Sequence, residues 1–179
     1  MKKSALALLL ALILTCSHEA FAVSNSSDAF MSLPFGHNYA RTQKRMTNSG
    51  ARVITPRKES LTMEGMFEGY PATFVFGFHN NKILKTKAAY LQSMGDALKD
   101  EMFYNNLQKS FNKAFGSGHE TPTLNRRNNK KLIMQNVWTP DRYTTITLTY
   151  NPDASKKFPG TSLSQRFIQI IYKTDKWDK

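Results

Sequence analysis

Cysteine is nearly absent: the 179 residues contain only Cys16, which follows an apolar N-terminal run. If that region is removed on export, the remaining chain has no cysteine, which excludes disulfides, thiol catalysis and cysteine metal ligands. Small exported domains often use disulfides because their compartment is oxidising. A chain of this length without them must be stabilised by its hydrophobic core.

Catalytic motifs of recognisable spacing are also missing. The chain has no Gly-x-Ser-x-Gly elbow, no P-loop and no dinucleotide-binding fingerprint. Three histidines lie beyond the N-terminal region, and none stands at metal-ligand spacing from another histidine or a carboxylate: His37, His79 and His119. We therefore predict no metal and no cofactor, and we favour a non-enzymatic role over catalysis.

Two pairs of polar residues come nearest to a catalytic arrangement. His119 precedes Glu120, and acid–base catalysis needs a titrating base beside a carboxylate. Adjacent residues in a flexible loop rarely hold that geometry. Glu64 and Glu68 could form the carboxylate pair of a glycosidase, but they stand next to a predicted turn. We interpret both pairs as surface residues.

Residues 1–22 have the pattern of a cleavable secretion signal. Lys2 and Lys3 precede an unbroken Ala/Leu/Ile run at 5–14, and Ala20-Phe21-Ala22 supplies the small-x-small pattern that a signal peptidase recognises. The run has about half of the roughly 20 residues that a membrane-spanning helix needs. We therefore predict cleavage after Ala22 and a periplasmic or secreted protein that is not transmembrane.

Cys16 leaves an alternative interpretation of this region open. A lipid-modified cysteine would follow the apolar run, as in bacterial lipoproteins. However, Thr15 stands where such signals carry a small Ala or Gly residue. We favour cleavage after Ala22 over lipidation at Cys16.

The rest of the chain has the length of one domain, and it is strongly basic. We expect a Ser/Asn-rich flexible leader at 23–30 and a single domain at 31–175. The whole sequence has a net charge of +12, and loss of 1–22 removes two lysines and one glutamate, which leaves +11. This excess favours anionic partners such as lipid head groups, lipopolysaccharide or wall polymers, although it could also serve solubility alone.

Hydrophobic periodicity predicts an α+β domain. Helices are expected at about 39–48, capped by Asn38, and at about 100–115, where apolar residues recur at spacings of three and four. Strands are expected at 60–66, 71–79, 83–91, 132–138, 143–150 and 167–172. Phe74, Phe76 and Phe78 share one face of a strand, and we interpret that face as its buried side. The element order predicts one antiparallel sheet of about six strands with two helices on one face.

In outline, this order of elements resembles the small exported helix-and-sheet modules typified by the β-lactamase inhibitor protein and an outer-membrane assembly lipoprotein. The resemblance is one of architecture, and architecture does not fix function.

Basic clusters indicate where a partner could bind. The predicted helix at 39–48 carries one cluster, and a polar loop carries a larger one, Arg126, Arg127, Lys130 and Lys131. We predict a binding or adaptor protein whose basic loop contacts an anionic envelope component or a protein. Nucleic acid is disfavoured because no exposed aromatics interleave with the cations. The alternatives are a small nuclease-like hydrolase acting on an anionic polymer, and a structural subunit marked by an exposed apolar patch.

Overall fold

The structure is a computed structural model that describes residues 25–57, 59–80, 82–120, 123–124, 131–153 and 166–177. The predicted signal lies outside these ranges, as do three residues of the predicted basic loop site, Arg126, Arg127 and Lys130. The fourth, Lys131, is the first residue of a strand. The structure therefore leaves the predicted loop site open.

Helices and strands alternate in two blocks along the described chain. The helices are α2 (Ser27–Met31), α3 (Tyr39–Asn48) and α4 (Ala97–Phe115). The strands are β1 (Arg52–Pro56), β2 (Ser60–Phe67), β3 (Tyr70–His79), β4 (Ile83–Gln92), β5 (His119–Glu120), β6 (Thr123–Leu124), β7 (Lys131–Trp138), β8 (Thr144–Asn151) and β9 (Phe167–Thr174).

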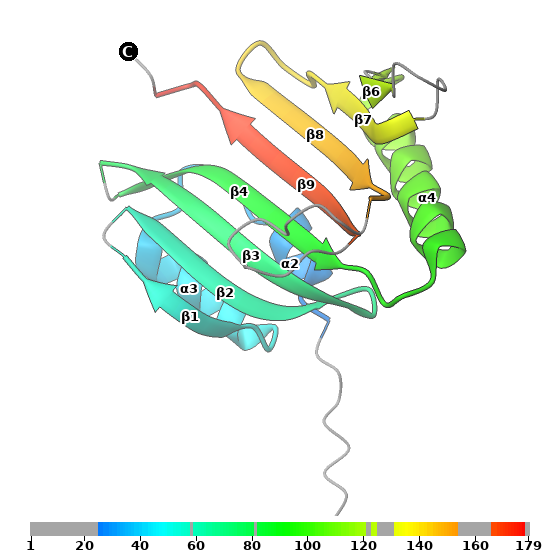
Figure 1. Cartoon of the computed structure of the whole chain (residues 1–179). Coiled ribbons are helices and arrows are strands. Elements are labelled where there is room, and N and C mark those ends of the chain that lie inside the picture. The colour runs from blue at the N-terminus through cyan, green and yellow to red at the C-terminus, as the bar shows by residue number, and fades with distance from the viewer. Residues whose placement is uncertain are drawn as a thin grey trace, which may run out of the picture.

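All the strands belong to one antiparallel sheet. Its order is β1-β2-β3-β4-β9-β8-β7-β5, and β6 also pairs with β7, so the described residues form nine strands. Figure 1 shows β1 to β4 followed by β9, β8 and β7 across the sheet. β1 to β4 form a meander, α4 crosses to the far edge, and β7 to β9 run back toward β4. Because β9 pairs with β4 over seven residues, it joins the two blocks into one sheet.

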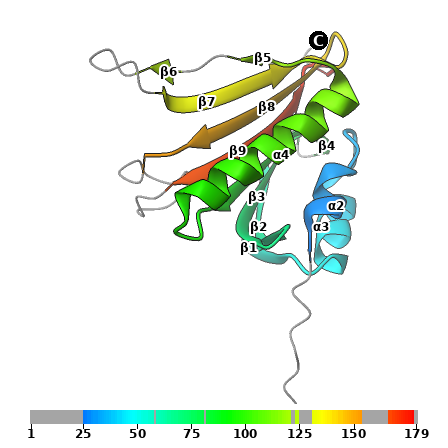
Figure 2. The ribbon, with the colours of Figure 1, turned by 90° about the vertical axis from the view of Figure 1, so that its right-hand side faces the viewer.

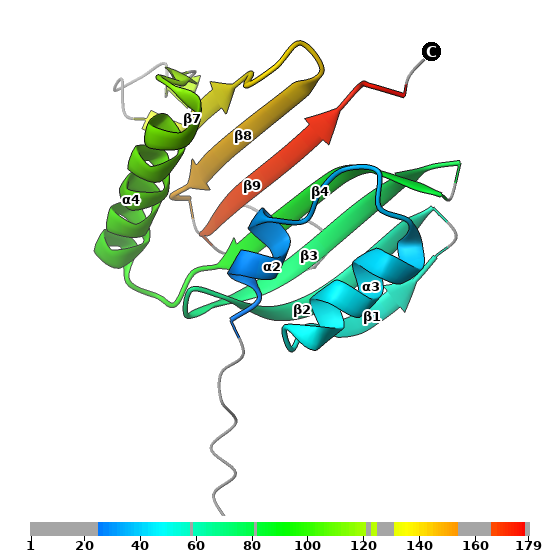
Figure 3. The same ribbon diagram turned by 180° about the vertical axis from the view of Figure 1, so that it is seen from behind.

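The three described helices lie on one face of the sheet (Figures 2 and 3). α2 and α3 cover the half formed by β1 to β4, and α4 lies over the half that contains β8 and β9. The prediction of an antiparallel α+β sheet with its helices on one face is confirmed. The predicted numbers, about six strands and two helices, differ from the structure, because the described residues form nine strands and α2 is a further helix.

The elements that the prediction missed are short. β1 has five residues, β5 and β6 have two each, and α2 has five. Segments this short carry too few residues for a periodic pattern, and tertiary contacts hold them instead. Phe30 of α2 is fully buried and contacts the rings of Phe67 and Phe74. The stretch expected as a leader, 23–30, thus contributes a core residue.

The core lies between the helices and the sheet. It consists of the alternate strand residues that face the helices, together with the inner faces of α2, α3 and α4. Phe74, Phe76 and Phe78 are buried, as predicted, at 0%, 0% and 7% exposure. Phe111 of α4 packs edge-on against Trp138 of β7, with ring centroids 5.3 Å apart. The rings of Phe30 in α2 and Phe111 in α4 both lie against Tyr172 of β9, so aromatic contacts connect the two halves of the helix layer.

Both long helices begin at side-chain caps. Asn38 accepts a hydrogen bond from the backbone N–H of Arg41 at 2.9 Å, and α3 spans the predicted residues. Asp96 accepts from the N–H groups of Leu98 and Lys99 at 3.0 and 3.2 Å, so α4 begins at Ala97. These caps satisfy N–H groups that have no partner within the helix.

The end of α4 is fixed against β7 by a close approach at a glycine. A Cβ at Gly118 would lie 2.5 Å from the Trp138 ring, so only glycine fits there. The indole N–H of Trp138 donates to Asn112 Oδ1 at 3.0 Å and to the Gly116 carbonyl at 3.1 Å. Within the described part of the chain, no helix is long and apolar enough to cross a membrane.

Candidate functional site

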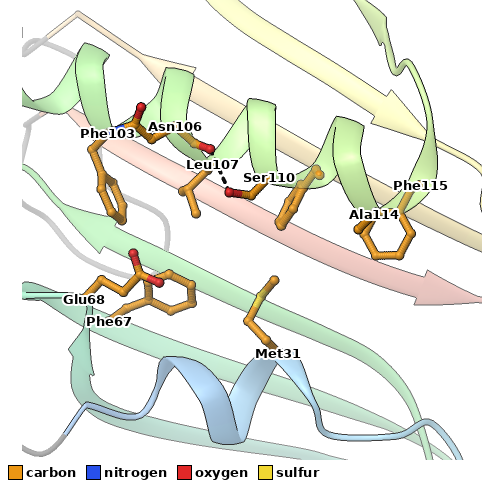
Figure 4. Close-up of a pocket in the computed structure, with 10 residues that line it drawn as sticks. Met31, Phe67, Glu68, Phe103, Asn106, Leu107, Ser110, Ala114 and Phe115 are labelled. Atoms are coloured by element: carbon orange, nitrogen blue, oxygen red, sulfur yellow. Dashed lines mark hydrogen bonds between the residues drawn. The ribbon is translucent and has the colours of Figure 1, made fainter.

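A groove separates α4 from the β2–β3 turn and α2. Its volume is about 360 Å³, and α4 contributes most of its wall (Figure 4). The apolar lining residues are Met31, Phe67, Phe103, Leu107, Phe111, Ala114 and Phe115, and the polar ones are Glu68, Asn106 and Ser110. Phe67 is completely buried, whereas Phe115 is 38% exposed. The groove is therefore an apolar hollow that opens to solvent.

The turn between β2 and β3 sets one end of the groove. Glu68 and Gly69 have positive φ angles of 47° and 87°, the conformation that a two-residue hairpin turn requires. The Asn25 side chain accepts a hydrogen bond from the Glu68 N–H at 3.0 Å. Tyr70, which follows Gly69, stacks on Phe103 of α4 with ring centroids 4.5 Å apart. This stack connects the turn to α4.

A second, more polar hollow adjoins the groove at the same turn. It measures about 270 Å³ and is lined by Glu68, Gly69, Tyr70, Met94, Asp96 and Lys99. Glu68 lines both hollows. Lys99 and Asp96 lie 3.9 Å apart, and both side chains are exposed, so this ion pair is weak. The groove thus has an apolar part along α4 and an acidic end beside the first turn of that helix.

Asp100 is buried behind this acidic end. Its side chain is 2% exposed, Oδ2 accepts a hydrogen bond from Ser93 Oγ, and Arg166 Nε lies 3.6 Å away. The other carboxylate oxygen, Oδ1, has no hydrogen-bond partner. The pKa of Tyr70 is raised by burial, then by the charges of Asp100 and Asp96, and by a hydrogen bond to Asp100. Burial, followed by the Asp100 charge, raises the pKa of Tyr150 to about 12.

Lys87 forms a different kind of buried site under α2. Its ammonium donates at 2.8 Å to the carbonyls of Phe30, Met31 and Leu33. The Tyr172 ring lies 4.5 Å from Nζ. Lysine is usually exposed, but the Lys87 side chain is 3% exposed on the helix-covered face of the sheet. Its long stem reaches the end of α2, where carbonyls lack helical partners.

The ionisation of Lys87 is affected by this environment. Burial and, to a smaller extent, the Arg45 charge lower the pKa of its ammonium to about 7. Burial disfavours the charged form, whereas carbonyl acceptors and aromatic faces favour it. We interpret Lys87 as the anchor of the 30–33 segment, because each of its three bonds goes to that segment.

The basic residues predicted on the first helix share one side of α3. Arg41, Lys44 and Arg45 are exposed, while Thr42 and Met46 face the core. Spacings of three and four put the cations on the same side of a helix. α3 contains no acidic residue. Arg45 also donates to Ser32 Oγ at 2.7 Å. This basic face of α3 (Arg41, Lys44 and Arg45) is the clearest cationic surface among the described residues.

The candidate catalytic pairs are not assembled by the fold. His119 and Glu120 are consecutive residues of β5, and consecutive strand side chains point to opposite faces. Glu64 is paired with Arg52, whereas Glu68 lines the groove. The His79 ring is hydrogen-bonded to the Asn80 side chain at 2.9 Å. Among the described residues, no group of three or more His, Cys, Asp or Glu side chains could hold a metal ion.

The sequence prediction missed the groove and the buried charges. The apolar positions of α4 were read as core, and Leu107 and Phe111 are buried as expected. Phe103, Ala114 and Phe115 instead line the open groove. An apolar stripe of this width is ordinary for a helix that packs on a sheet, so the groove left no separate signal in the sequence.

No protein-family model, curated protein or solved structure matches this chain. The functional assignment therefore rests on the geometry described above.

Proposed function

We propose that the protein is a non-enzymatic binding or adaptor module of the bacterial periplasm that contacts an anionic component of the envelope through the basic face of α3. The observation that carries this proposal is the combination of three exposed cations on one side of α3 with the absence of any acid in that helix. The net charge of +12 supports it, because long-range attraction would steer the protein toward anionic surfaces.

The neighbouring elements favour the same surface. α3 contacts β1 at the edge of the sheet. Arg52 is the first residue of β1, Arg57 follows its last residue, and both arginines are exposed. Arg52 is paired with Glu64, so its charge is partly neutralised. The predicted loop site, Arg126, Arg127, Lys130 and Lys131, stays a second candidate contact for the same partner.

Vesicle binding tests this proposal. The protein without residues 1–22 is mixed with vesicles of phosphatidylglycerol or of phosphatidylcholine, and the pelleted fraction is measured at low and at high salt. We expect binding to the anionic vesicles alone and release at high salt, because exposed charges are screened within about 8 Å at physiological ionic strength.

Charge-matched variants then locate the contact. Replacing Arg41, Lys44 and Arg45 by Gln removes three charges from α3, and replacing Lys99, Lys109 and Lys113 by Gln removes three from α4. Each cation near an anionic surface contributes about 1 kcal/mol, so the α3 variant should bind about 100-fold more weakly. Equal losses in the two variants would show that total charge, and not α3, drives binding. A loop variant with Gln at the four predicted positions measures the contribution of that second candidate.

A further inference from the structure

The groove beside α4 has the dimensions of a site for one large side chain. Its volume of about 360 Å³ lies at the lower end of the range for ligand pockets. Phe67, Phe103 and Phe115 line it together with Met31 from α2 (Figure 4). Aromatic rings and a methionine make an adaptable apolar surface. A bulky aromatic or aliphatic group is the occupant that such a lining favours.

The charge at the rim restricts the occupant further. Glu68 lines the groove, and Asp96 and Lys99 line the adjoining hollow beside the same turn as a weak, exposed ion pair, so this end holds two carboxylates and one ammonium. In a chain of net charge +12, this acidic end has the opposite sign to the molecule as a whole. It would attract a cation placed next to the apolar group and repel an anion there. Acyl chains with anionic head groups therefore fit this site poorly.

Exposed apolar side chains extend the surface beyond the groove. Met94, Leu98 and Met102 lie before and within the first turns of α4, and they are 66%, 67% and 57% exposed. Met94 also lines the acidic hollow. A ligand longer than one side chain could therefore continue along the start of α4.

We infer that the groove between α4 and the β2–β3 turn binds a segment of a partner protein in which a bulky apolar side chain lies next to a lysine or arginine. The apolar side chain enters among Phe67, Phe103 and Phe115, and the cation lies against Glu68 and Asp96. This site is separate from the basic face of α3, so the two surfaces give an adaptor two different contacts. Peptide binding in the groove and vesicle binding to the basic face of α3 are therefore separate results, and either can fail without the other.

Short peptides of defined charge test the inference. The probes are acetylated and amidated Ala-Lys-Phe-Lys-Ala, Ala-Glu-Phe-Glu-Ala and Ala-Lys-Ala-Lys-Ala, titrated into the ¹⁵N-labelled protein. We expect the first peptide to bind about tenfold more tightly than the others, a difference of about 1.4 kcal/mol. The shifted amides should be those of residues 67–70 and 103–115. Equal binding of the first two peptides, or shifts confined to other residues, would overturn the inference.

Two tryptophan variants provide a matched comparison. Ala114→Trp fills the groove, whereas Ala40→Trp makes the same substitution on the exposed side of α3. We expect about a tenfold loss of peptide binding for Ala114→Trp and none for Ala40→Trp. Ser110→Leu is a second groove variant, and thermal unfolding of each variant checks that it is folded. Unchanged binding in the folded groove variants contradicts the inference.

Two further outcomes distinguish other occupants. Glu68→Gln should reduce the preference for Ala-Lys-Phe-Lys-Ala over Ala-Glu-Phe-Glu-Ala, because it removes the carboxylate that both hollows share. Displacement of the peptide by phosphatidylcholine vesicles, which carry no net charge to attract either the peptide or the basic face of α3, would show that acyl chains occupy the groove. Concentration-dependent dimerisation that Ala114→Trp abolishes would show that a second copy occupies it. Either of these two results overturns the inference.

Discussion

Each half of the helix layer buries one charged side chain, but the two side chains differ in how fully they are hydrogen-bonded. Beneath α2, the Lys87 ammonium donates to three carbonyls within four residues of chain, from Phe30 to Leu33. At the start of α4, Asp100 has a bond from Ser93 and an Arg166 nitrogen at 3.6 Å, and one carboxylate oxygen has no partner. The first site is complete, whereas the second is only partly satisfied.

This difference separates a structural site from a candidate functional region. A buried charge with every donor satisfied fixes one arrangement of the surrounding chain. Buried polar atoms without a partner, such as Asp100 Oδ1, are uncommon in folded proteins, and some of them belong to functional sites. Asp100 also influences Tyr70, whose ring joins the acidic end to the groove. We therefore expect substitutions near Lys87 to change stability and substitutions near Asp100 to change binding as well.

The largest expected effect follows from removing Lys87. Lys87→Ala deletes the stem and leaves three buried carbonyls without their donor, so it should lower the free energy of unfolding by about 3–5 kcal/mol. Urea denaturation measures this change. Lys82→Ala, an exposed lysine in the preceding turn, is the control and should stay within about 0.5 kcal/mol. A loss below about 1 kcal/mol for Lys87→Ala would show that the 30–33 segment is held by its apolar contacts alone.

The pH dependence of stability reports the ionisation of Lys87. Its pKa is about 7 in the folded protein and 10.5 in its ordinary state. Between these values the unfolded chain holds a proton that the folded chain has released, so the free energy of unfolding rises with pH. The slope is at most about 1.4 kcal/mol per pH unit, and it vanishes below about pH 7.

Lys87→Met isolates this contribution because it cannot titrate. The difference in unfolding free energy between the native protein and Lys87→Met should increase from pH 7 to pH 9.5, and other titrating groups cancel in the difference. A flat difference over that range would mean that the three carbonyls keep Lys87 protonated in the folded state.

Asp100→Asn should have a smaller effect on stability and a distinct effect on Tyr70. The amide has nearly the same shape, so we expect a loss of about 1–3 kcal/mol. The pKa of Tyr70 should fall toward its ordinary value, because the charge of Asp100 and its hydrogen bond both raise it. Absorbance at alkaline pH measures this shift, with Tyr70→Phe to assign the signal. No change in the tyrosine titration would show that burial alone raises the pKa of Tyr70.

The sequence was sufficient for the regular elements and insufficient for the short ones. The ten-residue strand β3 has phenylalanine at alternate positions, Phe74, Phe76 and Phe78, so its period of two predicts a strand. α2 has five residues, and its position depends on Phe30 packing against Phe67 and Phe74, which lie far away in sequence. A contact between distant residues leaves no periodic signal in a single sequence.

Buried charges were unpredictable for a similar reason. Lys87 occupies a position that looks like the solvent side of an amphipathic strand, because lysine is usually exposed. Its burial depends on carbonyls from residues 30–33, more than fifty positions earlier in the chain. Asp100 lies near the start of α4, where a carboxylate suits the helix dipole even when it is exposed. Its side chain is instead 2% exposed, and its ion-pair partner, Arg166, lies near the other end of the chain.

The smallest expected effects compare the first turns of the two long helices. Asp96 accepts two backbone hydrogen bonds and carries a charge that suits a helix N-terminus, whereas Asn38 accepts one and is neutral. Loss of a capping side chain costs about 1 kcal/mol, so Asp96→Ala should cost somewhat more than Asn38→Ala. Asp96→Asn keeps the cap and removes the charge, so its loss of stability relative to the native protein measures the electrostatic contribution, and the further loss in Asp96→Ala measures the capping hydrogen bonds. If Asp96→Asn leaves stability unchanged but weakens binding of Ala-Lys-Phe-Lys-Ala, the Asp96 charge serves the acidic end of the groove more than it serves α4.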